Sequence, residues 1–281
     1  MIALVALYFI WGSTYLAMRW AVAELPPLLM ASTRFLCAGA LLMGFLRLRG
    51  AQLPSLRQWL YALPVGGLLF TIGNGLVAIS ETSIASGVAA VVCATSPLCA
   101  AVLVRFFGER TSAREWLGLL LGFAGVVVLS LGSGLRADPA MALLLCLAPM
   151  GWALGSILGR RLPMPGGMMA AAVQMIAGGA VTLLVALTIG ERIPTNISMS
   201  SVAALGYLIV AGSLIAFSCY SYLLRSTRLS IAMSYAYVNP VFAVLLGALL
   251  GGEAVGLETL AAMSLITIAV ATLMRARARS R

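Results

Sequence analysis

Long apolar stretches, separated by short polar ones, run through nearly the whole chain. Each is about 20 residues long, which is the length that crosses the hydrocarbon core of a bilayer as an α-helix. Ten such stretches can be assigned, at residues 2–22, 28–46, 59–79, 84–107, 115–133, 138–158, 168–190, 202–224, 230–250 and 257–274. The pattern predicts an all-α integral membrane protein with ten transmembrane helices.

Composition agrees with this assignment. Of the 281 residues, 62% are hydrophobic and only 9% are charged, whereas soluble domains are about 45–50% apolar. No connection is long enough to fold by itself, and the chain contains no lysine for a P-loop, so we expect no ATPase domain in it. The first span starts at Ile2 without a basic n-region, and we expect it to be retained. The expected partners are membrane lipid and a small-molecule substrate.

The net charge of +10 comes from arginines in short loops rather than from one basic face, so no nucleic-acid partner is expected. With the N-terminus inside, fourteen arginines fall on the cytoplasmic side and three on the other. The larger set is Arg47, Arg49, Arg57, Arg105, Arg110, Arg114, Arg160, Arg161, Arg225, Arg228, Arg275, Arg277, Arg279 and Arg281, and the smaller is Arg19, Arg136 and Arg192. The positive-inside rule predicts a multi-pass protein of the inner (cytoplasmic) membrane with both termini in the cytoplasm.

The two halves of the chain resemble each other. The stretches VVCATSPLCAAVL and YAYVNPVFAVLLG can be matched on their prolines, so that Pro97 corresponds to Pro240 and Ser96 to Asn239. Trp11 in the first half corresponds in the same way to Trp152 in the second. We predict two five-helix repeats, residues 1–134 and 135–281.

Five spans are an odd number, so the second repeat would enter the membrane from the opposite side. Inverted repeats are typical of transporters that work by alternating access, with the substrate near the midplane on interrupted helices. Pro97 and Pro240 are the candidate interruptions. Each would free the carbonyl four residues earlier, on Cys93 or Ala236, at a cost of about 3 kcal/mol. In lipid that carbonyl needs a partner, which favours a hydrated cavity and flexible kinks; kinks that only shape the bundle are the alternative.

Polar and aromatic residues at mid-span are the candidate lining of this cavity. Tryptophan normally gathers at the membrane interfaces, so two central indoles indicate either a cavity wall or bulky packing. Tyr237 is displaced by about 200° around the helix from Asn239, so one tyrosine is expected to face the cavity and the other a neighbouring helix. The candidates are Trp11, Asn74, Ser96, Trp152, Tyr235, Tyr237 and Asn239.

Arg34 is the one charged residue predicted within a span. Such a charge costs about 2.5–3.5 kcal/mol on insertion scales and indicates function. Glu24 and Glu81 are predicted at the same face of the membrane. We favour an ion pair or gate between Arg34 and one of these acids over direct binding of a substrate carboxylate.

Residue types that the sequence lacks limit the possible functions further. There is no histidine and a single aspartate, Asp138, so histidine-dependent catalysis and the usual metal sites are not expected. The prediction is a protein that is not an enzyme and has no cofactor or metal. Neither an acidic ring nor a filter loop for cations is present. A passive pore for small solutes and a non-transporting membrane scaffold remain alternatives.

Four stretches, IWGSTYLAMR, PPLLMASTRFLCAGALL, SIASGVAAVVCATSPLCAAVLVRFFGER and SYAYVNPVFAVLLGALLGGE, resemble EamA-type members of the drug/metabolite transporter superfamily. The resemblance implies ten helices in two inverted repeats around a central cavity lined mainly by the first four helices of each. Carried over by residue, it implies that Trp11, Ser96, Pro97, Trp152, Asn239 and Pro240 lie near the cavity. Many bacterial relatives export amino acids, including aromatic ones.

The expected function is therefore a secondary transporter that exports small metabolites, most of all amino acids, by alternating access. The absence of lysine speaks against a phosphorylated substrate, which related branches of the superfamily bind with lysine among their basic residues. Energy coupling and oligomeric state are left open by the sequence.

Overall fold

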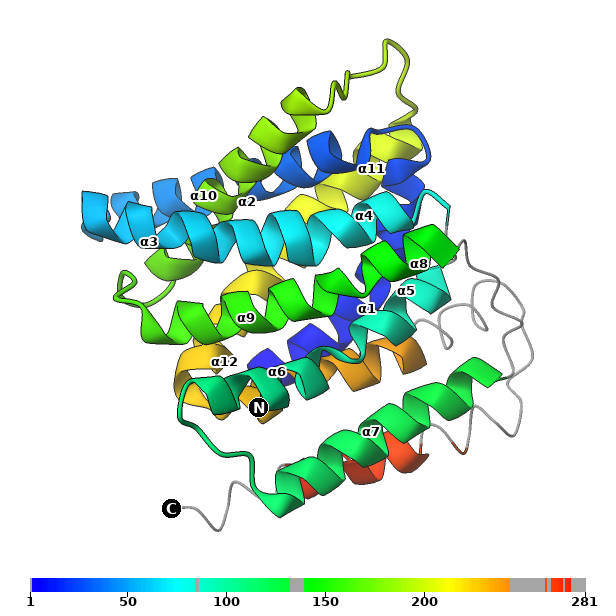
Figure 1. Ribbon diagram of the computed structural model, residues 1–281. Helices are drawn as coiled ribbons and strands as arrows, with labels where there is room; N and C mark the ends of the chain where they lie inside the picture. The colour runs from blue at the N-terminus through cyan, green and yellow to red at the C-terminus, as the bar shows by residue number, and fades with distance from the viewer. Residues whose placement is uncertain are drawn as a thin grey trace.

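The computed structural model describes residues 2–83, 86–131, 139–242, 261, 264–269 and 271–273, and every regular element in these ranges is a helix (Figure 1). The first half contains α1 (Ile2–Val22), α2 (Pro27–Leu48), α3 (Leu56–Gly66), η1 (Gly67–Gly75), α4 (Leu76–Ser80), α5 (Ser86–Cys93), α6 (Ser96–Phe106) and α7 (Ala113–Leu131). The second contains α8 (Pro139–Leu145), α9 (Leu147–Arg161), α10 (Met169–Thr188), α11 (Met199–Tyr207), η2 (Leu208–Ile215), α12 (Ala216–Ser226) and α13 (Leu229–Ala232). Residues 235–242, 264–269 and 271–273 are also helical.

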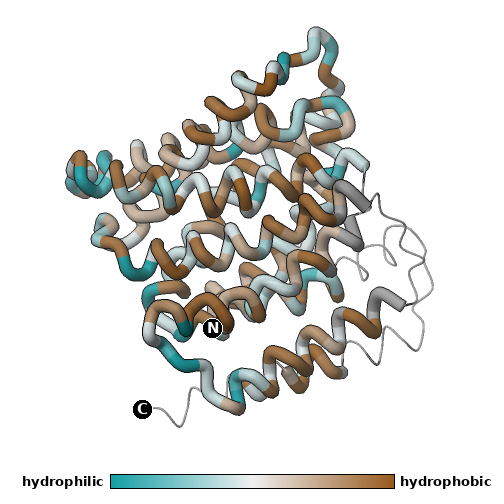
Figure 2. The backbone as a smooth tube through the Cα atoms, viewed as in Figure 1, coloured by the Kyte–Doolittle hydropathy of each residue, from teal (hydrophilic) through white to brown (hydrophobic). Residues whose placement is uncertain are grey.

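Six helical stretches of the described chain are long and apolar enough to cross a membrane: Ile2–Val22, Pro27–Leu48, Leu56–Ser80, Leu143–Arg161, Met169–Thr188 and Met199–Ser226. Figure 2 shows hydrophobic residues along the helices and hydrophilic ones mostly at their ends. The prediction of an all-α, multi-pass membrane protein is confirmed. The number of ten spans stays a prediction, because most of residues 243–274 lie outside the described ranges.

Side chains just outside the membrane segments fix where several helices begin. Ser55 and Gln58 form a capping box at the start of α3. At α7, the Ser112 backbone N–H donates to the Glu115 carboxylate at 2.9 Å, and the Glu115 N–H donates to the Ser112 hydroxyl at 3.3 Å. These reciprocal bonds satisfy donors that the first helical turn leaves free.

Helices from the two halves interleave. The helix α10 packs on α2 and α3, α9 packs along η1, and α1 packs on α11 and α12. In Figure 1 these helices run side by side across the molecule. The backbones of α3 and α10 touch, since a Cβ on Gly66 would lie 2.5 Å from the Gly178 nitrogen. Small residues permit such close approach between helices in membranes, so the packing of one half depends on the other.

The third long helix of each half contains a π-helical stretch. In the first half η1 lies between α3 and α4, and in the second η2 lies between α11 and α12. The candidate Asn74, between Gly73 and Gly75, lies at the end of η1. A π-helix widens the backbone turn and occurs frequently at functional sites. Both stretches face the centre of the bundle, where they supply residues to the cavity described below.

The fourth span of the first half is broken between α5 and α6, immediately before Pro97. The Cys93 carbonyl, which Pro97 cannot bond, accepts a 2.6 Å hydrogen bond from the Ser96 hydroxyl. The sequence favoured a water-filled cavity as the partner of this carbonyl. In the structure its partner is a side chain in the same turn. In the second half the break comes at residues 233–234, and Pro240 lies inside the helical segment 235–242.

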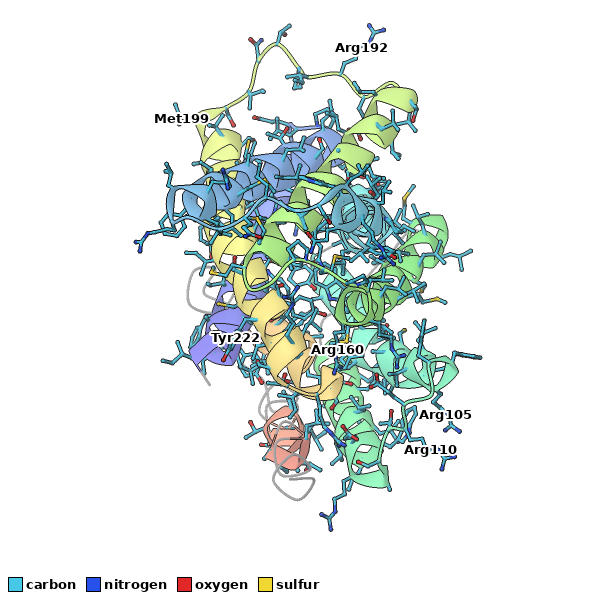
Figure 3. The ribbon with its side chains drawn as sticks, turned by 90° about the vertical axis from the view of Figure 1, so that its left-hand side faces the viewer. Arg105, Arg110, Arg160, Arg192, Met199 and Tyr222 are labelled. Carbon is cyan, nitrogen blue, oxygen red and sulfur yellow. The ribbon has the colours of Figure 1, made fainter. Side chains whose placement is uncertain are left out.

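Polar contacts join the two halves at one end of the bundle. The Glu109 carboxylate pairs with Arg161 at 2.8 Å, and the Glu115 carboxylate pairs with Arg228 at 3.1 Å. In Figure 3 this end faces the viewer and also carries Arg105, Arg110 and Arg160.

Other carboxylates join the halves at the opposite end. Glu24 accepts bonds from the backbone N–H and hydroxyl of Ser198, at 2.8 and 2.7 Å. The Glu191 carboxylate accepts the N–H groups of Leu28 and Leu29, at 3.1 and 2.7 Å. An anion at the N-terminus of α2 is favourable because the free N–H groups of the first turn point toward it. Each end of the bundle is thus held by contacts between the halves.

Candidate functional site: a central cavity

A cavity of about 80 Å³ lies at the centre of the bundle, between the two halves. Since one ordered water needs about 10–15 Å³, the space has room for several waters. From the first half the lining residues are Trp11, Thr14, Tyr15, Met18, Arg34, Phe35, Phe70, Gly73, Asn74, Val77, Cys93 and Ser96, and from the second they are Ala148, Pro149, Trp152, Gly212, Phe217, Tyr235, Ala236 and Asn239. The cavity is therefore built by both halves.

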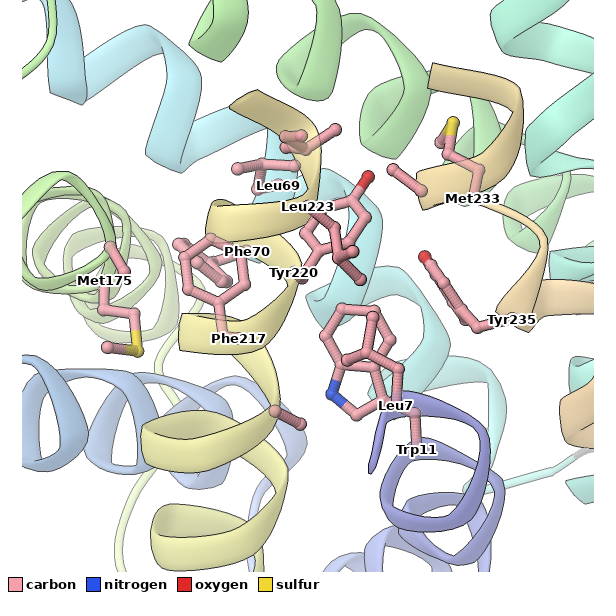
Figure 4. Packing of buried hydrophobic residues seen from close by; sticks show 14 of the residues in the cluster. Leu7, Trp11, Leu69, Phe70, Met175, Phe217, Tyr220, Leu223, Met233 and Tyr235 are labelled. Atoms are coloured by element: carbon pink, nitrogen blue, oxygen red, sulfur yellow. The ribbon is translucent and has the colours of Figure 1, made fainter. Parts of the chain in front are cut away.

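Trp11 is the centre of an aromatic cluster at this cavity (Figure 4). Its ring centroid lies 5.5 Å from that of Trp152 and 4.5 Å from that of Tyr235, both edge to face. The Trp11 indole N–H donates to the Gly212 carbonyl of η2 at 2.9 Å. Ring packing and this hydrogen bond together fix the orientation of the indole.

Trp152 is held in a similar way from the second half. Its indole N–H donates to the Tyr220 hydroxyl at 3.1 Å, and that hydroxyl lies 2.7 Å from the Ser156 hydroxyl. The Phe70 and Phe217 rings stand edge to face with Trp152, at 6.5 and 6.4 Å between centroids. The two indoles in the cavity wall thus have their N–H groups paired.

Arg34 brings a positive charge into this aromatic surrounding. Its side chain is 2% exposed. The Nε donates to the Ser213 hydroxyl of η2 at 2.6 Å, and the guanidinium lies 4.8 Å from the Phe35 ring centre. Its Nη1 is buried and has no hydrogen-bond partner within the described ranges. A buried donor without a partner costs about 1–3 kcal/mol, more for a charged group, so Nη1 is a candidate ligand-binding group.

The ion pair expected for Arg34 is not among the contacts of the described chain. No ion pair within 4.0 Å joins Arg34 to Glu24 or Glu81 there. Glu24 binds Ser198 instead. Glu81 acts on Arg34 through its charge, without a hydrogen bond. The physical reason is that Ser213 of η2 binds the guanidinium Nε.

Two amides complete the polar lining. The side-chain oxygens of Asn74 and Asn239 are buried, and neither has a partner within the described residues. Ser96, in contrast, uses its hydroxyl on the Cys93 carbonyl. Among the described residues, no three histidine, cysteine or acidic side chains gather as a metal site. The cavity therefore offers a guanidinium donor and amide oxygens beside aromatic faces.

The structure brings most of the sequence candidates together. Six of them line the cavity, namely Trp11, Asn74, Ser96, Trp152, Tyr235 and Asn239. Tyr237 lies elsewhere: it is fully buried against Gly122 of α7, where a Cβ on Gly122 would meet its ring at 2.7 Å. Pro97 lines a second pocket, which Glu109 also lines. Pro240 is buried and does not line the cavity.

Several lining residues were not singled out from the sequence. Thr14, Tyr15 and Met18 follow Trp11 at the three- to four-residue spacing of one helix face, so helical periodicity could have found them. No sequence pattern distinguishes Phe35 and Phe217, because an apolar residue in an apolar span can face the cavity, another helix or lipid. Their roles follow only from the packing of the halves.

Comparison with known proteins adds the family. The model of the EamA-like transporter family matches residues 1–131 and 139–275. The inner membrane transporter YedA of Escherichia coli K12, named as uncharacterized, is 46% identical over 269 residues, which cover 95% of this chain and 88% of YedA. The protein PecM of Dickeya dadantii is 29% identical, covering 85% of this chain and 80% of PecM.

A solved crystal structure shares the fold. It is 22% identical and superposes with a TM-score of 0.79, covering 99% of this chain and 98% of the other. At this identity the match concerns the fold alone. The family model accounts for nearly all of the sequence in two successive matches, and YedA aligns along almost the whole chain. The chain is therefore a member of the EamA-like transporter family, within the drug/metabolite transporter superfamily.

Proposed function

We propose that this protein is a secondary transporter that exports amino acids, aromatic and other neutral ones among them, across the inner membrane by alternating access. In this proposal ten helices form two inverted five-helix repeats, residues 1–134 and 135–281, and both termini are cytoplasmic. The inner membrane is supported by the name of the Escherichia coli relative and by the arginine distribution. No cofactor is required.

The observation that carries the proposal is the chemistry of the central cavity. The free Nη1 of Arg34 suits a carboxylate, which guanidinium groups bind with good geometry. The unpaired amide oxygens of Asn74 and Asn239 suit an ammonium group. The faces of Trp11 and Trp152 attract a cation and also accept an apolar side chain. Together these groups complement a zwitterion with an apolar or aromatic side chain.

Alternating access is supported by the contacts at the two ends of the bundle. Ion pairs of Glu109 and Glu115 join the halves at one end. Hydrogen bonds of Glu24 and Glu191 join them at the other. The exposed pair between Arg161 and Glu109 is worth about 0–1 kcal/mol, so it can open without a large cost. The cavity between the halves would then face one side at a time.

The direct test is counterflow in proteoliposomes that contain only this protein. Each of the twenty amino acids is loaded inside, and exchange is measured against a labelled amino acid outside. Decarboxylated amines, such as tryptamine in place of tryptophan, report whether the carboxylate is required. We expect saturable exchange with a subset of the amino acids and none with their amines, because the amines leave Arg34 unpaired.

Two other functions predict different results. A passive pore would give flux without saturation and without counterflow, and a scaffold would give no flux at all. The variants Ser96→Ala and Asn239→Ala test the cavity itself. At normal membrane levels, wild-type exchange by both variants would contradict the assignment of the site.

A further inference from the structure

Glu81 lies at the C-terminal end of α4, next to the central cavity. Its side chain is 5% exposed, and neither carboxyl oxygen has a hydrogen-bond partner in the described part of the chain. An isolated ionised carboxylate in such a place is very unfavourable, and a buried group of this kind tends to take up a proton. The position is one turn beyond Val77, which lines the cavity.

The other described carboxylates are different in kind. Each of the four accepts hydrogen bonds near an end of the bundle: Glu24 from Ser198, Glu109 from Arg161, Glu115 from Ser112 and Ser230, and Glu191 from the backbone of Leu28 and Leu29. Each of these carboxylates therefore has hydrogen-bond donors. Among the described acids, Glu81 is the one that is both buried and without a partner.

Opposing influences act on the Glu81 carboxyl. Burial and the free carbonyl ends of α4 favour the neutral acid, since the C-terminus of a helix carries partial negative charge. Arg19 of α1 and Arg34 of α2 favour the anion through their charge. The helix α8, which also packs on α4, carries no ionisable side chain between Pro139 and Leu145. Both protonation states are therefore accessible.

The charge of Glu81 is linked to the cavity. Arg34 responds to the charge on Glu81 and also lines the cavity with its free Nη1. Tyr15 of α1 and Cys93 of α5, which lie in the cavity wall, are further ionisable groups within electrostatic reach. When Glu81 is an anion, it neutralises part of the Arg34 charge. When it is protonated, that charge is free for a solute carboxylate.

We propose that Glu81 is a proton-binding site that couples solute movement to a proton. The proton binds the carboxylate to give the neutral acid when a solute carboxylate occupies Arg34, and it leaves to water when the solute departs, which restores the Glu81–Arg34 attraction. Proton and solute then cross in the same direction, so export is driven by the solute's own outward gradient. No other reactant is needed. The coupling rests on the proposed transport function, whereas proton binding by Glu81 does not.

Infrared spectroscopy of the purified protein in liposomes tests the proton site without any substrate. Wild type, Glu81→Gln and Glu24→Gln are titrated from acidic to alkaline pH while the carboxylic-acid C=O band is followed. We expect a band from a buried acid that disappears as the pH rises, is absent in Glu81→Gln and persists in Glu24→Gln. An unchanged band in correctly folded Glu81→Gln would overturn the proposal. Glu81→Asp keeps the carboxyl group, so a band in this variant shows that its loss in Glu81→Gln is not caused by misfolding.

Amino-acid flux in the same liposomes tests the coupling. We expect an imposed pH gradient to drive accumulation of an exchanged amino acid by wild type and not by Glu81→Gln. Counterflow without any response of the wild type to the gradient would overturn the coupling while leaving the transport function intact. If no amino acid is exchanged at all, the transport proposal fails, and the infrared titration still decides whether Glu81 binds a proton.

Discussion

The indole rings of Trp11 and Trp152 meet edge to face at the centre of the bundle, with centroids 5.5 Å apart and planes at 80°. These residues occupy matching places in the two halves of the sequence. Both line the cavity, and each donates its N–H to a group in the second half, the Gly212 carbonyl for Trp11 and the Tyr220 hydroxyl for Trp152. Two residues that were aligned with each other in the sequence are therefore in contact at the cavity.

Trp11→Ala should abolish amino-acid exchange. The substitution removes the ring that touches Trp152, Tyr220 and Tyr235, and large core truncations cost about 3–5 kcal/mol of stability. Trp11→Phe keeps an aromatic ring and loses only the bond to Gly212, so its exchange should be intermediate. Counterflow per folded molecule is the measurement. Trp20→Ala is the control, because Trp20 is exposed, and equal losses in both alanine variants would contradict the role of Trp11.

Gly212→Ala should weaken binding of carboxylate-bearing solutes by about tenfold, equivalent to about 1.4 kcal/mol. A Cβ at this position would lie 2.9 Å from Nη2 of Arg34 and 2.9 Å from the Thr14 methyl group. The guanidinium must therefore shift. The matched control is Gly206→Ala in α11, where a Cβ would meet nothing within 4 Å. The apparent Km in counterflow separates the two, and equal values for both variants would show that Arg34 does not bind the solute.

Membrane orientation can be tested with single cysteines in a cysteine-free background. Thr195 and Gln52 are exposed and lie in connections at opposite ends of the bundle. Because the arginine distribution predicts cytoplasmic termini, an impermeant maleimide should label Thr195→Cys in intact spheroplasts. It should label Gln52→Cys only after the membrane is opened. The reverse labelling would place the N-terminus outside.

The contact between Glu24 and Ser198 should make stability depend on pH. Hydrogen bonds from the Ser198 hydroxyl and backbone N–H hold the pKa of Glu24 below its usual value. A lowered pKa stabilises the fold above the pKa of the unfolded state, and this contribution is lost as pH falls through the folded-state pKa. Wild type should therefore unfold at a higher temperature than Glu24→Gln at neutral pH, and the two should converge in acid. A constant difference across pH would exclude this origin.

Much of the fold follows from local sequence signals. Apolar runs of membrane-spanning length predicted helices whose observed ends lie close to the expected ones, as in α1 at Ile2–Val22. The contacts between Ser112 and Glu115 at the start of α7 are likewise local. Such signals are readable because hydrophobic length and capping depend on residues near in sequence. The mid-span positions of Trp11 and Trp152 likewise indicated that both lie near the cavity.

Other features depend on contacts between distant residues. The sequence could not indicate that Arg34 binds Ser213 rather than an acid, because that choice depends on where η2 packs against α2. Nor could it separate Tyr235 from Tyr237, since both lie in one apolar stretch and only the position of α7 draws Tyr237 away from the cavity.

By itself, therefore, the sequence determined the membrane-spanning helices, the family and the polar and aromatic residues available for a cavity. Each of these can be recognised from residues that are close together in the sequence. Only the tertiary structure decided which of them share that cavity. It also decided that Glu81 is buried, with no hydrogen-bond partner among the described residues and within electrostatic reach of Arg34, because burial and hydrogen bonding are set by helices that the chain brings together from both halves.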